Sequence, residues 1–250
     1  MIPKRIYQTW KTKLLPSGIS HVIKKMMEIN PTYTHYLYDD ADMDAFVHDN
    51  FPGEISNAYD LLNIGAARAD LWRYLILYKY GGVYLDIDAV ILKSLDNLIC
   101  PDESAIITRE PFEGLFNQWI LIFKRGHPLL REVINQCVRN IQTRSSNNIL
   151  HLTGSTVITK MINKHLTGLE LNGDVWHTPD NILERMFNVD DYYYKCRFYG
   201  IDMNEYAKYH SDYYKMLYFD NMQWEDEQKV KCIFKDGVKN PNEEIDKEEL

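Results

Sequence analysis

The chain has 250 residues, 45% of them hydrophobic, and a formal net charge of −8. This length and composition suffice for the core of one large domain. The acidic balance argues against a nucleic-acid partner, because binding phosphates requires a basic face. The four cysteines are widely spaced and include no Cys-x-x-Cys pair, which predicts reduced thiols rather than a disulfide framework or a zinc site.

The sequence carries no membrane-spanning signal. No apolar run approaches the roughly 18 residues that a transmembrane helix needs, and Met1 leads directly into a predicted strand rather than into a signal sequence. We therefore expect a soluble chain without a transmembrane segment that works in the cytoplasm, unless a membrane anchor has been removed from it.

Strands and helices alternate along the first part of the chain. Residues 5–10 and 33–38 have strand composition, and residues 20–29 and 39–50 have helical patterns, the first ended by Asn30-Pro31. This alternation predicts parallel strands joined by crossover helices, as in an open α/β sheet. Ligands of such sheets bind beyond the carboxyl ends of the strands. Trp10, Asp86 and Asp88 fall at predicted carboxyl ends, so we expect them to line one crevice.

The stretch from Asn57 to Gly82 predicts one long helix that Ser56 or Asn57 caps and a double glycine ends. Its packing face has a spacing of three and four residues: Leu62, Ala66, Ala69, Arg73, Leu77 and Tyr80. Asp70 and Arg73 could form a helical ion pair. Both lie on or near the packing face, however, where charged groups are usually paired or bind a ligand.

Residues 83–92 have the composition of a strand that carries two aspartates. Because side chains alternate along a strand, Tyr84, Asp86 and Asp88 should share one face, with the carboxylates about 7 Å apart. Most Asp-X-Asp pairs are solvated surface groups. Two carboxylates in an apolar strand are costly without a positive partner, so the context favours a divalent cation.

The remaining segments predict further strands at residues 104–108 and 118–123, a helix over residues 128–144, and a short helix that opens near residue 152 and ends near His165. The small hydroxylated residues around Gly154 are ordinary helix caps. Nine tyrosines lie between residues 190 and 224, where they could pack between layers or stack on sugars. His210 lies among them, and a lone histidine is more often a structural residue than a ligand.

Three segments resemble glycosyltransferase family 32, which includes yeast-type initiating mannosyltransferases and capsular polysaccharide transferases and is related to the catalytic core of the large clostridial glucosylating toxins. They are Ile2 to Trp10, Arg68 to Tyr74, and Tyr80 to Asp88. The resemblance implies a GT-A-type, Rossmann-like open twisted α/β sheet flanked by helices. We expect this single domain, with helical additions, to span residues 1–234, followed by a charged, flexible tail over residues 235–250.

The resemblance also implies roles for individual residues. Asp88 would bind the metal directly, and Asp86 would contact ribose or sugar and the metal. Asp70 and Arg73 would hold sugar hydroxyls or phosphate, while Tyr84 would line the nucleotide site. Arginine suits that role because its planar fork pairs with phosphate.

The remaining implied contacts come from other segments. Trp10, next to Thr9 at a strand end, would stack on the nucleotide base, and Asn117 would face the sugar. Gly154 would lie near the donor or acceptor, although relatives have proline where this chain has Ser155. His210 would supply another metal or phosphate contact, although Trp224 lacks the serine that precedes it in relatives.

The function that follows is metal-dependent transfer of a hexose or N-acetylhexosamine from a nucleotide diphosphate sugar to a glycan or other hydroxyl acceptor, with retention of anomeric configuration. A UDP-sugar is the favoured donor, with GDP-mannose as the alternative. Oxygen ligands indicate Mn²⁺ or Mg²⁺. The departures from the family pattern leave open an inactive protein that binds carbohydrate or nucleotide sugar, and the two aspartates alone would also suit a metal-dependent phosphohydrolase.

Overall fold

The computed structural model describes residues 1–15, 17–87, 89–91, 94–108, 115–165, 185–187, 193–195 and 234–235. Asp88 and His210 lie outside the described residues, as do nearly all of the tyrosine-rich region and of the tail. The boundary expected at residue 234 therefore stays a prediction. Among the described residues, none of the helices combines the length and apolar character needed to cross a bilayer.

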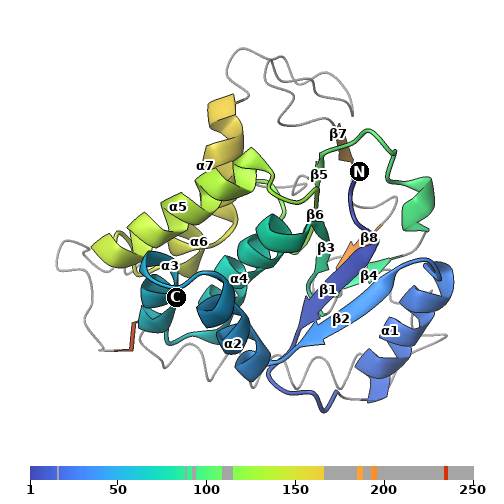
Figure 1. Ribbon diagram of the computed structural model, residues 1–250, viewed down its shortest axis with the longest axis horizontal. Coiled ribbons are helices and arrows are strands. Elements are labelled where there is room, and N and C mark those ends of the chain that lie inside the picture. Colours follow the sequence, from blue (N-terminus) through green and yellow to red (C-terminus); the bar gives the residue numbers. More distant parts are fainter. Residues whose placement is uncertain are drawn as a thin grey trace, which may run out of the picture.

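The protein is built on a six-stranded mixed sheet (Figure 1). The strands follow the order β2 (Thr34–Tyr38), β1 (Arg5–Thr9), β3 (Gly82–Leu85), β6 (Ile120–Phe123), β5 (Ala105–Thr108) and β7 (Arg185–Phe187). β1 pairs parallel with both β2 and β3, as the alternating sequence predicts. β5 pairs parallel with β7, whereas β6 is antiparallel to both β3 and β5, so β6 is the strand of this sheet that departs from the expected parallel arrangement.

Helices cover both faces of this sheet (Figure 1). On one face α1 (Ser17–Ile29) and the short helix η1 (Leu95–Asn97) pack against the sheet. On the other face lie α2 (Asp40–Asn50), α3 (Glu54–Leu61), α4 (Gly65–Tyr80), α5 (Pro128–Thr143), α6 (Ile149–Leu152) and α7 (Ser155–His165). Alternation along β1 explains both cores, because Ile6 belongs to the first and Tyr7 to the second.

The long helix predicted from residue 57 is two helices. α3 already begins at Glu54, so the prediction of Ser56 or Asn57 as the cap is wrong. Leu62 then adopts an extended conformation and forms an antiparallel bridge with Phe234. This long-range contact interrupts the helix where the local spacing of apolar residues predicts continuity. α4 restarts at Gly65 and carries Asp70 and Arg73.

Gly81 ends α4, as the sequence predicts. Its backbone is left-handed, with a φ of 66°, and its N–H donates to the Leu77 carbonyl over 2.7 Å. A Cβ at this position would lie 2.5 Å from the backbone nitrogen of Arg125. Glycine is therefore required both by conformation and by space, and the chain can turn from α4 directly into β3.

The strand predicted over residues 83–92 is also interrupted. β3 ends at Leu85, and the Asp86 carbonyl accepts from the Ala89 N–H over 2.9 Å, which turns the chain. β4 (Ala89–Ile91) then pairs with β8 (Tyr193–Lys195) in a separate two-stranded sheet. The expected position of Asp86 at the carboxyl end of a strand is therefore confirmed, whereas the prediction that residues 89–92 continue the same sheet is wrong.

His48, near the end of α2, predicts a measurable pH dependence of stability. Its two ring nitrogens face acceptors: Nδ1 lies 2.7 Å from the Asp44 carbonyl and Nε2 lies 3.0 Å from Asp60 Oδ2. The Asp44 carbonyl, followed by Asp60, raises the pKa of His48. The charged ring therefore stabilises the fold below the unfolded pKa, and this stabilisation is lost as the pH rises through the folded pKa.

We expect His48→Ala to lower the free energy of unfolding at pH 5.5 by less than about 1 kcal/mol, because the pair is exposed. The loss should be smaller at pH 8, and Asp60→Asn should show the same trend. Urea unfolding at the two pH values measures it. An equal loss at both would contradict a charged His48.

Candidate functional site

The carboxyl ends of β1 and β3 lie side by side at one edge of the sheet. In the register of the two strands Tyr7 faces Tyr84, so Thr9, the last residue of β1, and Trp10, which follows it, lie level with the end of β3, which Asp86 follows. The buried Gln8 side chain joins the two ends, since its Nε2 donates to the Asp86 carbonyl over 3.1 Å. The predicted convergence of Trp10 and Asp86 is therefore present in the structure.

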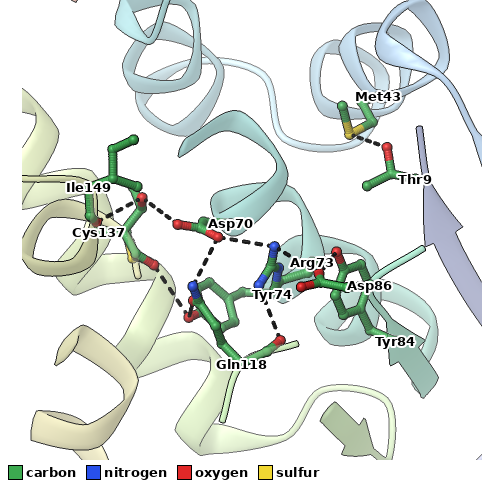
Figure 2. A network of polar contacts seen from close by, with 11 residues as sticks. Thr9, Met43, Asp70, Arg73, Tyr74, Tyr84, Asp86, Gln118, Cys137 and Ile149 are labelled. Carbon is green, nitrogen blue, oxygen red and sulfur yellow. Dashed lines mark hydrogen bonds and ion pairs between the residues drawn. The ribbon is translucent and has the colours of Figure 1, made fainter. Parts of the chain in front are cut away.

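A buried arginine links two carboxylates at this edge (Figure 2). Arg73 Nη2 lies 3.1 Å from Asp70 Oδ1 and 3.3 Å from Asp86 Oδ1. The side chains of Asp70 and Arg73 are 5% and 6% exposed, whereas that of Asp86 is 19% exposed. Asp86 is thus the member of the triplet that a ligand reaches most directly.

Tyr84 contacts both Asp86 and Arg73. Its hydroxyl donates to Asp86 Oδ1 over 2.7 Å, and its ring lies 4.7 Å from the Arg73 guanidinium. Tyr84 is 1% exposed. In this arrangement Tyr84 orients the two charged groups through its hydroxyl and its ring face.

Asp70 has further partners from two other elements (Figure 2). Gln118, which precedes β6, donates from Nε2 to Asp70 Oδ1 over 3.1 Å, and Thr153 Oγ1 donates to Asp70 Oδ2 over 3.0 Å. Tyr74 Oη lies 2.8 Å from Gln118 Oε1, and the Gln118 carbonyl accepts from Arg73 Nη1. The charged residues therefore belong to one hydrogen-bonded unit.

Burial sets the protonation of this unit. It raises the pKa of Asp70, while Arg73 and the hydrogen bond from Thr153 oppose that rise. Burial alone would lower the pKa of Arg73, but Tyr84 and the two carboxylates outweigh it and raise the pKa. Burial also raises the pKa of Tyr84 well above its usual value. Tyr84 is therefore a protonated donor beside a permanently charged arginine.

Thr9 and Trp10 lie next to this unit at the same edge. Trp10 is partly exposed and packs against the small apolar cluster of Ile19, Val22 and Ile87. The Thr9 hydroxyl lies 3.1 Å from Met43 Sδ and so points toward α2 (Figure 2). Trp10 thus contributes to packing and still presents part of its ring.

Asn117 and Gly154 have structural roles of their own. Asn117 is buried, and its Nδ2 donates to Thr108 Oγ1 over 2.8 Å. Gly154 lies between α6 and α7, where a Cβ would come within 2.6 Å of Leu150 Cα. Asn117 precedes Gln118 and Gly154 follows Thr153, and both Gln118 and Thr153 donate to Asp70. Their contacts with a donor stay predictions.

Sequence reasoning missed Gln8, Gln118 and Thr153. Gln8 lies inside the opening motif, Gln118 follows a residue that we singled out, and Thr153 was assigned to helix capping. Thr153 instead follows the end of α6 and donates to a carboxylate on α4. The signal available in the sequence was only their position beside motif residues.

The oxygen-rich chemistry around Asp86 suits a hard divalent cation. Among the described residues, no group of three or more His, Cys, Asp or Glu side chains could hold a metal ion. Asp88 and His210 are the two other predicted ligands, and both lie outside that part of the chain. The structure therefore gives the position of Asp86 alone among the expected ligands, and the roles of Asp88 and His210 stay predictions.

Comparison with known proteins identifies relatives of this chain. Residues 16–105 match a family described as glycosyltransferase sugar-binding region containing DXD motif. Inositol phosphoceramide mannosyltransferase 3 of Schizosaccharomyces pombe is 36% identical over 138 residues, which are 55% of this chain and 38% of that protein. The initiation-specific alpha-1,6-mannosyltransferase of Candida albicans is 31% identical over 219 residues, covering 75% of this chain and 54% of that protein. The chain thus spans about half, or less, of the length of these relatives.

A solved structure shares the fold. PaToxG Glycosyltransferase superimposes with a TM-score of 0.56 at 20% sequence identity, covering 68% of this chain and 71% of that one. The open sheet with helices on both faces has a glycosyltransferase as its neighbour, which confirms the predicted GT-A-type α/β fold class.

Proposed function

We propose that this chain, whose residues 16–105 carry the glycosyltransferase sugar-binding region containing the DXD motif, transfers a sugar from a nucleotide diphosphate sugar to a hydroxyl acceptor. The observation that carries the proposal is the buried Arg73 that links Asp70 to Asp86 beside Trp10. A positive group at the carboxyl edge of the sheet, next to an aromatic ring, suits a nucleotide with a charged diphosphate.

Each residue of this edge has a task in the proposed reaction. Trp10 stacks on the base, and Asp70 accepts from sugar hydroxyls. The Arg73 guanidinium pairs with both carboxylates, and its buried Nε has no hydrogen-bond partner among the described residues. An arginine so placed can stabilise the charge that develops on the departing diphosphate.

Asp86 and Asp88 would hold Mn²⁺ or Mg²⁺, with His210 as a further ligand. When bound, such an ion acts as a Lewis acid on the departing diphosphate. The protein's own contribution is orientation, since Tyr84 and Arg73 both fix Asp86 Oδ1. We propose that transfer retains the anomeric configuration, as the family resemblance implies, and we assign no covalent nucleophile.

Mannose is the sugar that we propose. Two relatives more than 30% identical to this chain are named mannosyltransferases, which favours GDP-mannose over the UDP-sugar expected from the sequence. The name of one relative includes inositol phosphoceramide, and the name of the other includes no acceptor. We therefore propose a carbohydrate or glycolipid hydroxyl as the acceptor class. The cytoplasmic location stays a prediction.

The test is release of the nucleoside diphosphate from a panel that includes GDP-mannose, UDP-glucose and UDP-N-acetylglucosamine. Each donor is incubated with Mn²⁺, with Mg²⁺ and with a chelator. We expect metal-dependent release of GDP from GDP-mannose. Release of inorganic phosphate would favour the phosphohydrolase, and calorimetric binding of a donor without turnover would favour a binding protein. A chain that binds no donor at all would contradict the proposal.

A further inference from the structure

Thr153 contacts the charged unit without being able to reach a substrate. It is the residue after α6, and its side chain is completely buried. Its Oγ1 lies 3.0 Å from Asp70 Oδ2 and 3.5 Å from the Ile149 carbonyl. A hydroxyl has one hydrogen to donate, and the charged and closer acceptor binds it more strongly. The hydroxyl of Thr153 therefore serves Asp70.

The backbone of Thr153 is fixed by separate contacts. Its N–H donates to the Ile149 carbonyl over 2.9 Å, and the N–H of Gly154 donates to the same oxygen over 3.0 Å. The Thr153 carbonyl lies 3.3 Å from Tyr74 Oη and 3.9 Å from Cys137 Sγ. Helices α4, α5 and α6 thus hold the turn in place whether or not the hydroxyl is present.

The two oxygens of Asp70 are held from opposite sides. Oδ1 accepts from Arg73 and Gln118, while Oδ2 accepts from Thr153. The last torsion of an aspartate side chain has only a broad preference, so contacts at a single oxygen leave the plane of the carboxylate poorly defined. The hydroxyl of Thr153 supplies the second point that fixes this plane.

We propose that Thr153 is a positioning residue for the donor sugar: by fixing the carboxylate plane of Asp70 it sets the direction in which Asp70 accepts from a sugar hydroxyl. The proposal rests on the proposed function, because it needs Asp70 to contact the sugar. It assigns the turn between α6 and α7 to sugar recognition rather than to helix capping. Thr153 would then affect the sugar part of the donor more than the nucleotide part, since Arg73 also keeps its contacts with Asp86 and Gln118.

The experiment compares two ligands by calorimetry in the presence of Mn²⁺: GDP-mannose and GDP, or the corresponding UDP pair if the donor panel identifies a UDP-sugar. Thr153→Val removes the hydroxyl and keeps the shape. We expect about tenfold weaker binding of the nucleotide sugar, the size expected when the hydrogen bond from a sugar hydroxyl to the charged Asp70 is lost. Binding of the nucleoside diphosphate should weaken by less than about twofold. Thr153→Ser should restore both affinities. Thr143→Val, which removes an exposed hydroxyl on α5, is the matched control and should change neither.

A double-mutant cycle tests the route of the effect. In an Asp70→Ala background, where no carboxylate is left for the hydroxyl to orient, Thr153→Val should cause no further loss for the nucleotide sugar. Equal loss for both ligands, or an undiminished loss in that background, would overturn the positioning role. Should Thr153→Val fail to fold, Thr153→Ser and Thr153→Ala provide the comparison, because they differ only in the hydroxyl. A wild-type chain that binds neither ligand would instead refute the proposed function itself.

Discussion

Replacing Arg73 with methionine should both destabilise the protein and abolish its transferase activity. Arg73 is the group that compensates the buried carboxylate of Asp70, and it also pairs with Asp86. Removing one partner of a buried ion pair typically costs about 3–5 kcal/mol, because the other charge stays buried. In a chain of this size that corresponds to a fall in melting temperature of roughly 6–20 °C. Thermal unfolding and release of the nucleoside diphosphate measure the two effects.

The loss of stability in Arg73→Met should depend on pH. Without the arginine, burial raises the pKa of Asp70 further, so the folded state binds a proton more tightly than the unfolded state does. Stability then falls as the pH rises. We expect a smaller destabilisation at pH 5 than at pH 8.

Two variants test this explanation. Asp70→Asn combined with Arg73→Met should be more stable than Arg73→Met alone at pH 8, because the uncompensated charge is gone. Arg131→Met, which removes an exposed arginine on α5, should change the free energy of unfolding by less than about 0.5 kcal/mol. A double variant as unstable as the single one would show that packing, and not charge, accounts for the loss.

The sequence predicts the fold well where local chemistry determines structure. Asp39 caps α2, because its carboxylate accepts from a backbone N–H of the first turn, that of Asp42, over 2.9 Å. Gly81 ends α4 because its conformation excludes other residues. The cap and the positive φ depend on neighbours within a few positions, which a single sequence contains, whereas the close approach of Arg125 to Gly81 depends on the fold.

The sequence fails where distant contacts override a local pattern. Leu62 continues the apolar spacing of a helix, yet it pairs with Phe234 and breaks that helix in two. Asp86 continues the composition of a strand, yet its carbonyl accepts from the Gln8 side chain, 78 positions away, as well as from the Ala89 N–H that closes a turn. In both places a backbone hydrogen-bonding group finds a partner that periodicity does not reveal.

The same distinction divides the candidate site. Asp70, Arg73 and Asp86 could be predicted because they lie in motifs with a family resemblance. Gln118 and Thr153 could not, since they contact Asp70 from 48 and 83 positions away in the chain. Residues that bind the reacting groups have recognisable types and spacings, whereas the residues that orient them depend on how helices and strands pack.

Replacing Asp86 with asparagine should separate activity from stability. Arg73 keeps its pair with Asp70, and the Tyr84 hydroxyl can still donate to the amide oxygen of the new side chain. We therefore expect the free energy of unfolding to change by no more than about 1 kcal/mol, as for a hydrogen bond that is weakened but retained.

Turnover of the donor should nevertheless fall by at least about 10²-fold in Asp86→Asn, because the residue proposed to hold the metal loses its charge, and a bound metal supplies several kcal/mol of charge stabilisation. Titration with Mn²⁺ should show weaker apparent binding of the ion than in the wild-type chain. Asp102→Asn, which neutralises an exposed aspartate, should leave both quantities unchanged. Wild-type turnover in Asp86→Asn would remove Asp86 from the catalytic machinery, and a loss that follows unfolding would make its role structural, like the stability role expected of Arg73.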